Sequence, residues 1–163
     1  MDKPRVALFP ASFDPITNGH LDLITRSLDV FDEVVVAVAR NIGKSGTFSL
    51  DERMEMLENV LREHPRARTE TFDGLMVDHA KTIGATAVIR GLRATADFEY
   101  EFEMALMNKH LYPGIEILFM MASQEYLYVS SSRLKELVRF GAAVDDFVPP
   151  IVAEMLTKKL GQG

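Results

Sequence analysis

The chain of 163 residues contains no cysteine. Disulfide bonds and thiolate metal sites are therefore excluded, and the composition suits a reducing compartment. Positive charge is also scarce, since 18 lysines and arginines face 24 aspartates and glutamates and leave a formal net charge of −6. This balance argues against general affinity for nucleic acid or anionic membrane, so any bound polyanion must be held by a local cluster.

Several common sequence signatures are also missing. No long apolar run predicts a signal peptide or a membrane span, so we expect a cytoplasmic protein that binds neither membrane nor nucleic acid. Gly-x-Gly-x-x-Gly does not occur, and Gly43-Lys44-Ser45 has Val38 where a P-loop requires glycine. The absence of Gly-x-Ser-x-Gly and His-Glu-x-x-His removes the best sequence support for a serine hydrolase or a zinc protease.

Apolar runs typical of buried strands alternate with helical patterns along the chain. The expected strands cover residues 5–9, 33–39, 68–72, 87–91 and 115–121. The expected helices cover residues 20–28, 49 to about 65, 75–83 and 98–111, with two more that start near Ser130 and after Pro149-Pro150. This alternation predicts a single domain over residues 1–163, an α/β, Rossmann-like, doubly wound five-stranded parallel sheet with helices on both faces.

Polar segments follow four of the expected strands. They cover residues 10–20 after the first strand, 41–47 after the second, 90–93 after the fourth and 130–132 after the fifth. Because the carboxyl ends of parallel strands meet at one edge of a sheet, we expect these segments to converge on one ligand-binding rim.

The segment from Pro10 to His20 is the most informative of the four, because it joins a buried strand to a helix start. Unpaired N–H groups and the positive end of the helix dipole attract an anion to Gly19 and His20. Taken alone, His20 is better interpreted as a surface histidine at a helix start, and it is the flanking turn Thr17-x-Gly19 that favours a catalytic role. Arg90 is more telling because it follows the apolar pair Val88-Ile89, where a charge is costly unless it is paired or faces a ligand.

The polar residues of these segments together resemble a known superfamily. The residues that carry the resemblance are Ser12, Thr17-Asn18-Gly19-His20, Lys44, Arg90-Gly91-Leu92-Arg93 and Ser130-Ser131-Ser132. They resemble the nucleotidyltransferase superfamily with the Thr/His-x-Gly-His signature. Within it, the wording of residues 13–20, 89–101, 107–108 and 130–132 is similar to the phosphopantetheine adenylyltransferase family.

This resemblance implies an enzyme that transfers the adenylyl group of ATP to 4'-phosphopantetheine and gives dephospho-coenzyme A and pyrophosphate. That reaction is the penultimate step of coenzyme A biosynthesis. The family also implies a homohexamer, while feedback by coenzyme A stays open. Mg²⁺ is implied as the cofactor by the triphosphate itself, since no protein cage of carboxylates is evident.

The resemblance also implies roles for individual residues. His20 is expected to stabilise the transition state at the α-phosphate, while Ser12 and Lys44 hold the acceptor phosphate, and these three are the expected catalytic residues. Substrate binding is expected at Ser12, Lys44, Arg90 and Met76, with Met76 against the pantetheine arm. Physical chemistry fits these roles, since such a transfer asks a protein mainly to position reactants and stabilise negative charge.

The remaining matches are expected contacts to ATP. Arg93 would neutralise the leaving pyrophosphate, residues 126–129 would form a strand end beside the adenine, and the serines would hold the β- and γ-phosphates. The expected ATP-binding residues are Ser12, Phe13, His20, Gly91, Leu92, Arg93, Glu101, Tyr126, Leu127, Tyr128, Val129, Ser130, Ser131 and Ser132.

Some alternatives stay open at this point. Nicotinate-mononucleotide adenylyltransferase and glycerol-3-phosphate cytidylyltransferase share the His20 turn but not the full wording of residues 90–101, and a non-catalytic nucleotide sensor could use the same scaffold. Asp97 and its neighbouring acids are interpreted as the solvated face of a helix. The chain departs from the usual family wording at Ala11, where glycine generally sits, so a methyl group stands close to the expected phosphate site.

Overall fold

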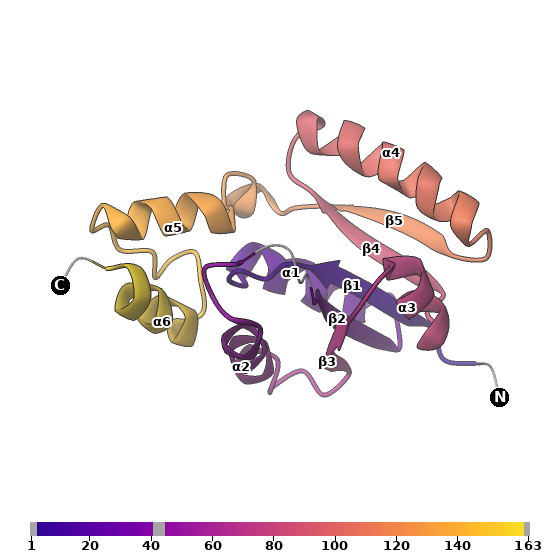
Figure 1. The fold of residues 1–163 in the computed structure, drawn as a ribbon, viewed down its shortest axis with the longest axis horizontal. Helices are drawn as coiled ribbons and strands as arrows, with labels where there is room; N and C mark the ends of the chain where they lie inside the picture. Colours follow the sequence, from indigo (N-terminus) through magenta and orange to yellow (C-terminus); the bar gives the residue numbers. More distant parts are fainter. Residues whose placement is uncertain (1–2, 41–44, 162–163) are drawn as a thin grey trace.

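Five parallel strands form the centre of the structure, a computed structural model that describes residues 3–40 and 45–161 (Figure 1). The strands are β1 (Val6–Ala11), β2 (Glu33–Ala39), β3 (Ala67–Phe72), β4 (Ala87–Leu92) and β5 (Glu116–Met121), in the order β3-β2-β1-β4-β5. The helices are α1 (Asn18–Leu28), α2 (Leu50–Val60), α3 (Met76–Thr82), α4 (Thr95–Leu111), α5 (Ser131–Arg139) and α6 (Pro150–Leu160), with a 3₁₀ turn η1 (Gln124–Tyr126). The predicted α/β fold with a five-stranded parallel sheet is confirmed.

β1 is the central strand, and this position creates the crevice of the fold. Val6 of β1 lies opposite Glu33 of β2, and Ala7 lies opposite Ala87 of β4. The chain builds the sheet outward from β1 on one side and then returns to build the other side from β4. Connections from the two neighbouring strands therefore leave in opposite directions, and a crevice opens beyond the carboxyl ends of β1 and β4.

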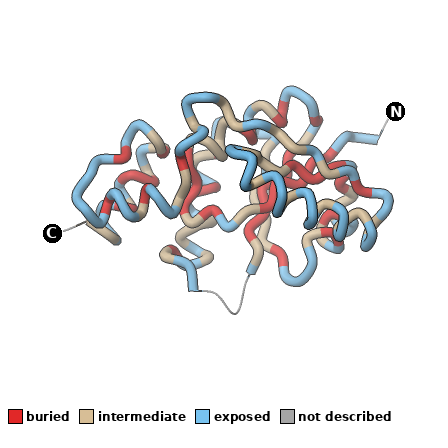
Figure 2. Tube along the Cα trace, turned by 90° about the horizontal axis from the view of Figure 1, so that it is seen from above, coloured by how far each residue is buried: buried red, intermediate tan, exposed pale blue. Residues whose placement is uncertain are grey.

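Helices cover both faces of the sheet, as predicted. One apolar core joins one face to α1, α2, α5 and α6, through residues such as Leu23, Leu57, Leu134 and Leu156. A second, smaller core on the other face contains Val77 of α3. Figure 2 shows buried residues running through the middle of the molecule. α4 packs over β4 and β5 but has no buried residue of its own.

Two helix boundaries illustrate how local sequence sets the elements. The predicted cap of α2 is confirmed, because the Ser49 hydroxyl accepts from the Glu52 N–H at 3.2 Å and the Glu52 carboxylate accepts from the Ser49 N–H at 2.7 Å. This helix ends at Val60, however, earlier than the predicted stop near Pro65. α4 begins at Thr95, three residues before its predicted start.

One prediction about the fifth strand is wrong. β5 ends at Met121, so residues 126–129 are not a strand end, and the serine run does not follow the strand directly. The Tyr126 N–H bonds to the Ser123 carbonyl at 2.8 Å, and the Val129 N–H bonds to the Tyr126 carbonyl at 3.0 Å. These backbone groups are paired locally in turns and are not free for a sheet ladder.

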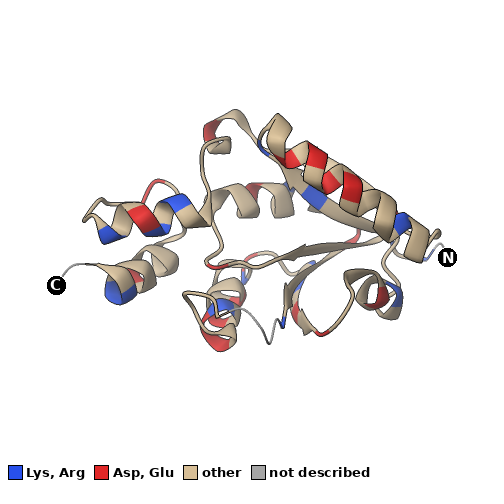
Figure 3. Cartoon of the chain, turned by 45° about the horizontal axis from the view of Figure 1, so that its top comes forward, with Lys and Arg blue, Asp and Glu red and all other residues tan. Residues whose placement is uncertain are grey.

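The surface of the fold is unevenly charged. Figure 3 shows acidic residues, in red, recurring along α4, where residues 97, 99, 101 and 103 are aspartate or glutamate. Across residues 3–40 and 45–161, no helix is long and apolar enough to cross a membrane.

Candidate active site

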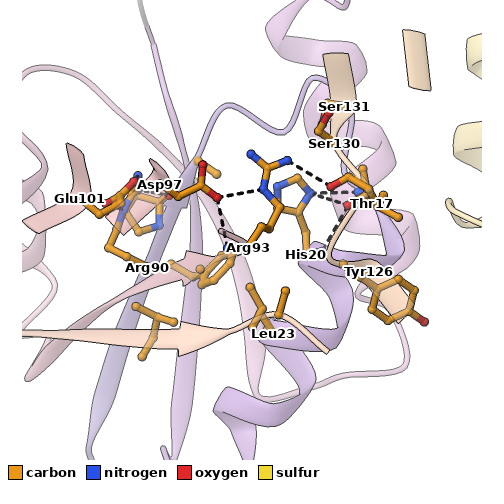
Figure 4. A pocket seen from close by; sticks show the side chains of 18 of the residues that line it. Thr17, His20, Leu23, Arg90, Arg93, Asp97, Glu101, Tyr126, Ser130 and Ser131 are labelled. Carbon is orange, nitrogen blue, oxygen red and sulfur yellow. Dashed lines mark hydrogen bonds and ion pairs between the residues drawn. The ribbon is translucent and has the colours of Figure 1, made fainter. Parts of the chain in front are cut away.

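A cavity of about 460 Å³ lies at the crevice between β1 and β4. Its walls come from the ends of these two strands, the start of α1, the first turns of α4, η1 and the start of α5. Figure 4 shows side chains from these separate segments pointing toward one another. Cavities of this size suit small-molecule ligands, and the place is the one expected for a doubly wound sheet.

His20 is the third residue of α1 and forms a reciprocal hydrogen-bonded pair with Thr17. The Thr17 hydroxyl accepts from the His20 backbone N–H at 3.3 Å, and His20 Nδ1 accepts from the Thr17 backbone N–H at 3.0 Å. Glutamate or glutamine usually closes such a capping box, so the imidazole takes that place here. Because Nδ1 accepts, the proton of the neutral ring sits on Nε2, which is left to donate to a ligand in the cavity.

The surroundings of His20 keep its ring neutral. Its pKa is lowered from the ordinary value to about 4, first by burial of the ring and then by the positive charge of Arg93. Phe13 packs edge-on against the imidazole, with the ring centroids 5.1 Å apart. At pH 7 the site therefore holds a fixed, uncharged hydrogen-bond donor beside a cationic guanidinium.

Arg90 occupies the wall between β4 and α4. Its Nε and Nη2 donate to the two carboxylate oxygens of Glu101 at 2.7 and 2.6 Å, and its Nη1 donates to the Pro10 carbonyl at 2.8 Å. Such bidentate pairing fixes both side chains in one orientation. The positive charge of Arg90, which would be costly next to the apolar pair Val88-Ile89, is thus paired with Glu101. Arg90 also joins α4 to the end of β1.

Arg93 forms a second link between the β4 end and α4. Its Nε lies 3.4 Å from Asp97 Oδ2, and its Nη1 donates to the Val129 carbonyl at 3.2 Å. The Asp97 carboxylate also accepts from the Arg93 backbone N–H at 3.2 Å. Arg93 therefore ties α4 to the segment before α5 and places a cation opposite His20, as Figure 4 shows.

The start of α5 completes the cavity with hydroxyl and N–H groups. Ser130 is the N-cap and accepts from the Arg133 N–H at 3.2 Å, while the Ser131 hydroxyl donates to the Pro15 carbonyl at 2.8 Å. Ser132 also lines the cavity. The first N–H groups of a helix have no partner within it, so this end of α5 presents donors suited to phosphate oxygens.

Comparison with known proteins agrees with this geometry. Residues 8–137 match the model of the cytidylyltransferase-like family. The chain is 51% identical over 158 residues to the phosphopantetheine adenylyltransferase of Geobacter metallireducens, which covers 97% of each chain. It is 50% identical over 155 residues to the enzymes of the same name from Syntrophotalea carbinolica, covering 95% of this chain and 93% of the relative, and from Caldanaerobacter subterraneus, covering 95% and 97%. The chain belongs to the phosphopantetheine adenylyltransferase family.

The structure brings most of the site residues predicted from the family resemblance to the cavity. Those that line it are His20, Arg90, Gly91, Arg93, Glu101, Tyr126, Val129, Ser130, Ser131 and Ser132. Gly91 is needed for packing as well, because a Cβ at this position would lie 2.5 Å from Leu23 Cδ1. Ala11 lines the cavity as the last residue of β1, so its methyl group is accommodated in the strand.

Other residues predicted from the family lie elsewhere. Lys44 falls outside the described residues, and its role stays a prediction. Ser12 is exposed, Phe13 is buried behind His20, and Met76 packs on the smaller core at the start of α3. The last three in this group are Leu92, Leu127 and Tyr128, of which Tyr128 packs edge-on against Phe147 outside the cavity. Their contacts to substrate also stay predictions.

Two polar residues of the cavity have no site role in the sequence interpretation. Asp97 was taken for part of a solvated helix face, yet it lines the cavity and holds Arg93. The spacing of four residues between these opposite charges was the signal available in the sequence. Tyr100 also lines the cavity, although 64% of it is exposed. It lies within residues 89–101, which carry the family resemblance, but the sequence interpretation assigns it no role.

Proposed function

We propose that this chain transfers the adenylyl group of ATP to 4'-phosphopantetheine and releases dephospho-coenzyme A and pyrophosphate. The observation that carries the proposal is His20, held by its capping box as a neutral Nε2–H donor in a cavity that also contains Arg93 and the start of α5. Family membership identifies the two substrates, and the cavity supplies the groups that such a transfer requires.

The reaction needs no covalent intermediate with the protein. A phosphate oxygen of 4'-phosphopantetheine attacks the α-phosphorus of ATP, the bond from that phosphorus to the bridging oxygen breaks, and pyrophosphate leaves with the bonding electron pair. His20 Nε2–H would donate to an α-phosphate oxygen, where negative charge is crowded in the transition state. Arg93 and the start of α5 would balance the charge on the β- and γ-phosphates as pyrophosphate departs.

For the acceptor side, the proposal places the phosphate of 4'-phosphopantetheine near Ser12, Lys44 and Arg90, with the arm toward Met76. Arg90 supports this because it stands beside the end of β1 and still has N–H groups beyond the three hydrogen bonds described. Ser12 supports it because this residue is exposed and directly precedes the turn that leads to His20.

Mg²⁺ is the proposed cofactor. The two carboxylates among the described lining residues, Asp97 and Glu101, are paired with Arg93 and Arg90. In the described part of the chain, no group of three or more histidine, aspartate or glutamate side chains could hold a metal ion. With these carboxylates already paired, the ion would be held mainly by the triphosphate, which Arg93 and the start of α5 would bind, and it would supply neutralisation of part of the phosphate charge.

We propose a homohexamer that works in the cytoplasm. Large apolar side chains are exposed on α4 and on the edge strand β5, which suits burial against second copies of the chain. These residues are Phe98, Tyr100, Phe102, Met104, Leu106, Met107, Leu111, Leu118 and Met121. Light scattering after size-exclusion chromatography should give six times the 18.3 kDa mass, and Leu106→Glu should reduce it. A monomeric wild type would overturn this part.

Coenzyme A contains the pantetheine arm and adenosine that the reaction joins, so we expect it to compete with both substrates.

The activity itself is tested by mixing the protein with ATP, Mg²⁺ and 4'-phosphopantetheine and measuring pyrophosphate. No release above a heat-treated control would exclude it. Two other substrate pairs, nicotinate mononucleotide with ATP and glycerol 3-phosphate with CTP, should give at most a trace of pyrophosphate. Turnover of either pair in place of 4'-phosphopantetheine would favour nicotinate-mononucleotide adenylyltransferase or glycerol-3-phosphate cytidylyltransferase.

A further inference from the structure

Asp14 and Lys135 form an ion pair that none of the roles above explains. The Lys135 ammonium lies 2.9 Å from Asp14 Oδ2, and the two side chains are only 15% and 14% exposed. Asp14 follows Phe13 in the turn that leads to His20, whereas Lys135 is on α5, downstream of the serine run. The pair therefore joins the turn that carries His20 to the helix that begins at the nucleotide side of the cavity.

The Asp14 carboxylate also holds a third segment. Its Oδ2 accepts from the Thr47 N–H at 2.9 Å, and its Oδ1 accepts from the Phe48 N–H at 2.8 Å. Gly46 lies so close that a Cβ there would come within 3.2 Å of Asp14 Oδ2. Residues 45–48 follow Lys44 directly in the chain. Both carboxylate oxygens are thus committed to the segment that leads away from the predicted acceptor-phosphate residue.

The electrostatics of Asp14 agree with this geometry. Burial acts to raise its pKa, but the hydrogen bonds from Phe48, Lys135 and Thr47 outweigh that effect, and the pKa lies below its ordinary value. The carboxylate is therefore charged at neutral pH. An ionised carboxylate with little exposure that accepts two backbone N–H groups and an ammonium fixes its neighbours firmly, because losing a partner leaves a largely buried charge less well compensated.

We propose that Asp14 and Lys135 are positioning residues, which hold residues 45–48, the His20 turn and α5 together so that the acceptor side of the site is assembled against the nucleotide side. This proposal rests on the proposed function for its kinetic consequence but not for its structural one. Neither residue lines the cavity, so both act through other groups.

The chain offers a matched control in a second lysine–carboxylate pair. Lys159 of α6 donates to the Glu52 carboxylate, which closes the cap of α2 just after residues 45–48. Its ammonium lies 5.0 Å from the Phe48 ring centroid. This pair does not involve the His20 turn. Lys159→Met should therefore perturb the neighbourhood of residues 45–52 without disturbing the proposed connection.

The first test is hydrogen exchange on the full-length protein without substrates. Asp14→Asn and Lys135→Met should speed exchange in peptides covering residues 45–49, and Lys135→Met should also do so at the start of α5. Lys135→Arg, which keeps the charge, should restore protection. If Asp14→Asn fails to fold, Lys135→Met carries the test, because it leaves both backbone hydrogen bonds to Asp14 in place. Exchange in Lys135→Met that is faster only in residues 45–52, the pattern expected for Lys159→Met, with the start of α5 as in the wild type, would overturn the proposal.

The second test uses steady-state kinetics with ATP and 4'-phosphopantetheine. Loss of a hydrogen-bonded charge here should raise KM for 4'-phosphopantetheine about tenfold, with a smaller change in KM for ATP, and Lys135→Arg should recover most of it. Equal changes in both KM values, or a lower Tm with unchanged KM, would reduce the pair to a structural one. If the wild type makes no pyrophosphate, the proposed function fails, while the exchange result still decides whether the pair holds the three segments.

Discussion

α1 and α4 both line the cavity, but they are held in place by different means. α1 buries Leu23, Ile24, Ser27 and Leu28 against the sheet and begins with a reciprocal cap. α4 buries no residue and has no side-chain cap, although it is the longest helix of the described chain. Ion pairs link it to the sheet through Arg90–Glu101 and Lys109–Glu116, and Phe98 packs edge-on against Phe119 of β5. Arg93, directly after β4, adds a pair with Asp97.

The difference shows how two sides of one site can depend on different parts of the protein. The side that carries His20 is fixed by the core of the chain itself, and its hydrogen-bond geometry is set by the backbone. The α4 side depends largely on charged pairs that are partly exposed, and it leaves several large apolar side chains exposed. We therefore expect α4 to gain rigidity from burial against further copies of the chain, whereas α1 does not need it.

The sharpest test of the α1 side is His20→Ala. If the ring acts chiefly on the transition state, kcat should fall by about 10²–10³-fold, while the affinity for ATP measured by calorimetry changes little. His20→Gln is the matched control, because glutamine can close the same capping box, so it should keep the wild-type Tm and still lose most turnover. Equal losses in turnover and ATP affinity would instead make His20 a binding residue.

The α4 side is tested by Glu101→Gln, which breaks the bidentate pair with Arg90. One carboxylate oxygen is replaced by a donor, so the free energy of unfolding should fall by about 1–2 kcal/mol in urea titrations. kcat/KM for ATP should fall about tenfold as the wall loosens. Glu99→Gln removes an exposed charge from the same helix and should change neither quantity. Indistinguishable effects of the two variants would show that the pair is not what holds α4.

A smaller effect is expected when the cap of α1 is changed. Thr17→Val removes the hydroxyl that accepts from His20 N–H and should lower the free energy of unfolding by about 1 kcal/mol. Thr17→Ser keeps that hydroxyl and should cost little. Nitrogen NMR of the ring should still show the proton on Nε2 in both variants, because the Thr17 backbone N–H remains. A proton on Nδ1 in the wild type would contradict the hydrogen-bond assignment.

The last prediction concerns pH. The pKa of His20 is about 4 in the folded chain, compared with about 6.5 for an ordinary histidine. Between these two pH values His20 binds a proton in the unfolded chain but not in the folded one. The free energy of unfolding should therefore fall as the pH drops from about 6.5 to about 4. NMR titration of the ring should give a midpoint near 4. Arg93→Ala should raise the midpoint but leave it below 6.5, because burial is the larger cause, and Arg62→Ala, on an exposed turn, should not move it.

The elements of the sheet were largely predictable because their signals are local. After Glu33, the run to Ala39 is apolar throughout and contains four β-branched valines, and the structure begins and ends β2 at Glu33 and Ala39. Ser49 and Glu52 lie three residues apart, a capping-box pattern that is enough to predict a helix start. The turns after β5 carried no such signal, because Tyr126 to Val129 have the composition of a strand and differ from one only in where their N–H groups bond.

The site was predictable in its membership and not in its pairings. The motif wording placed His20, Arg90 and the serines on one rim, and the cavity contains them. The pairing of side chains follows only from the three-dimensional path of the chain. Arg90 pairs with Glu101, and Asp14 pairs with Lys135, which is 121 residues away in the sequence. Side-chain partners so far apart have no periodicity from which they could be inferred.

The central place of β1 also has a consequence for synthesis on the ribosome. Its neighbour β2 follows at once, but the Arg90 to Pro10 contact on its other side spans 80 residues. During translation this apolar strand therefore has one unpaired edge until β4 emerges, and we expect the long-range pairing with β4 to form later than the pairing with β2. A stalled or truncated chain that stops before β4 would expose that edge, which makes early truncations candidates for aggregation and for capture by chaperones.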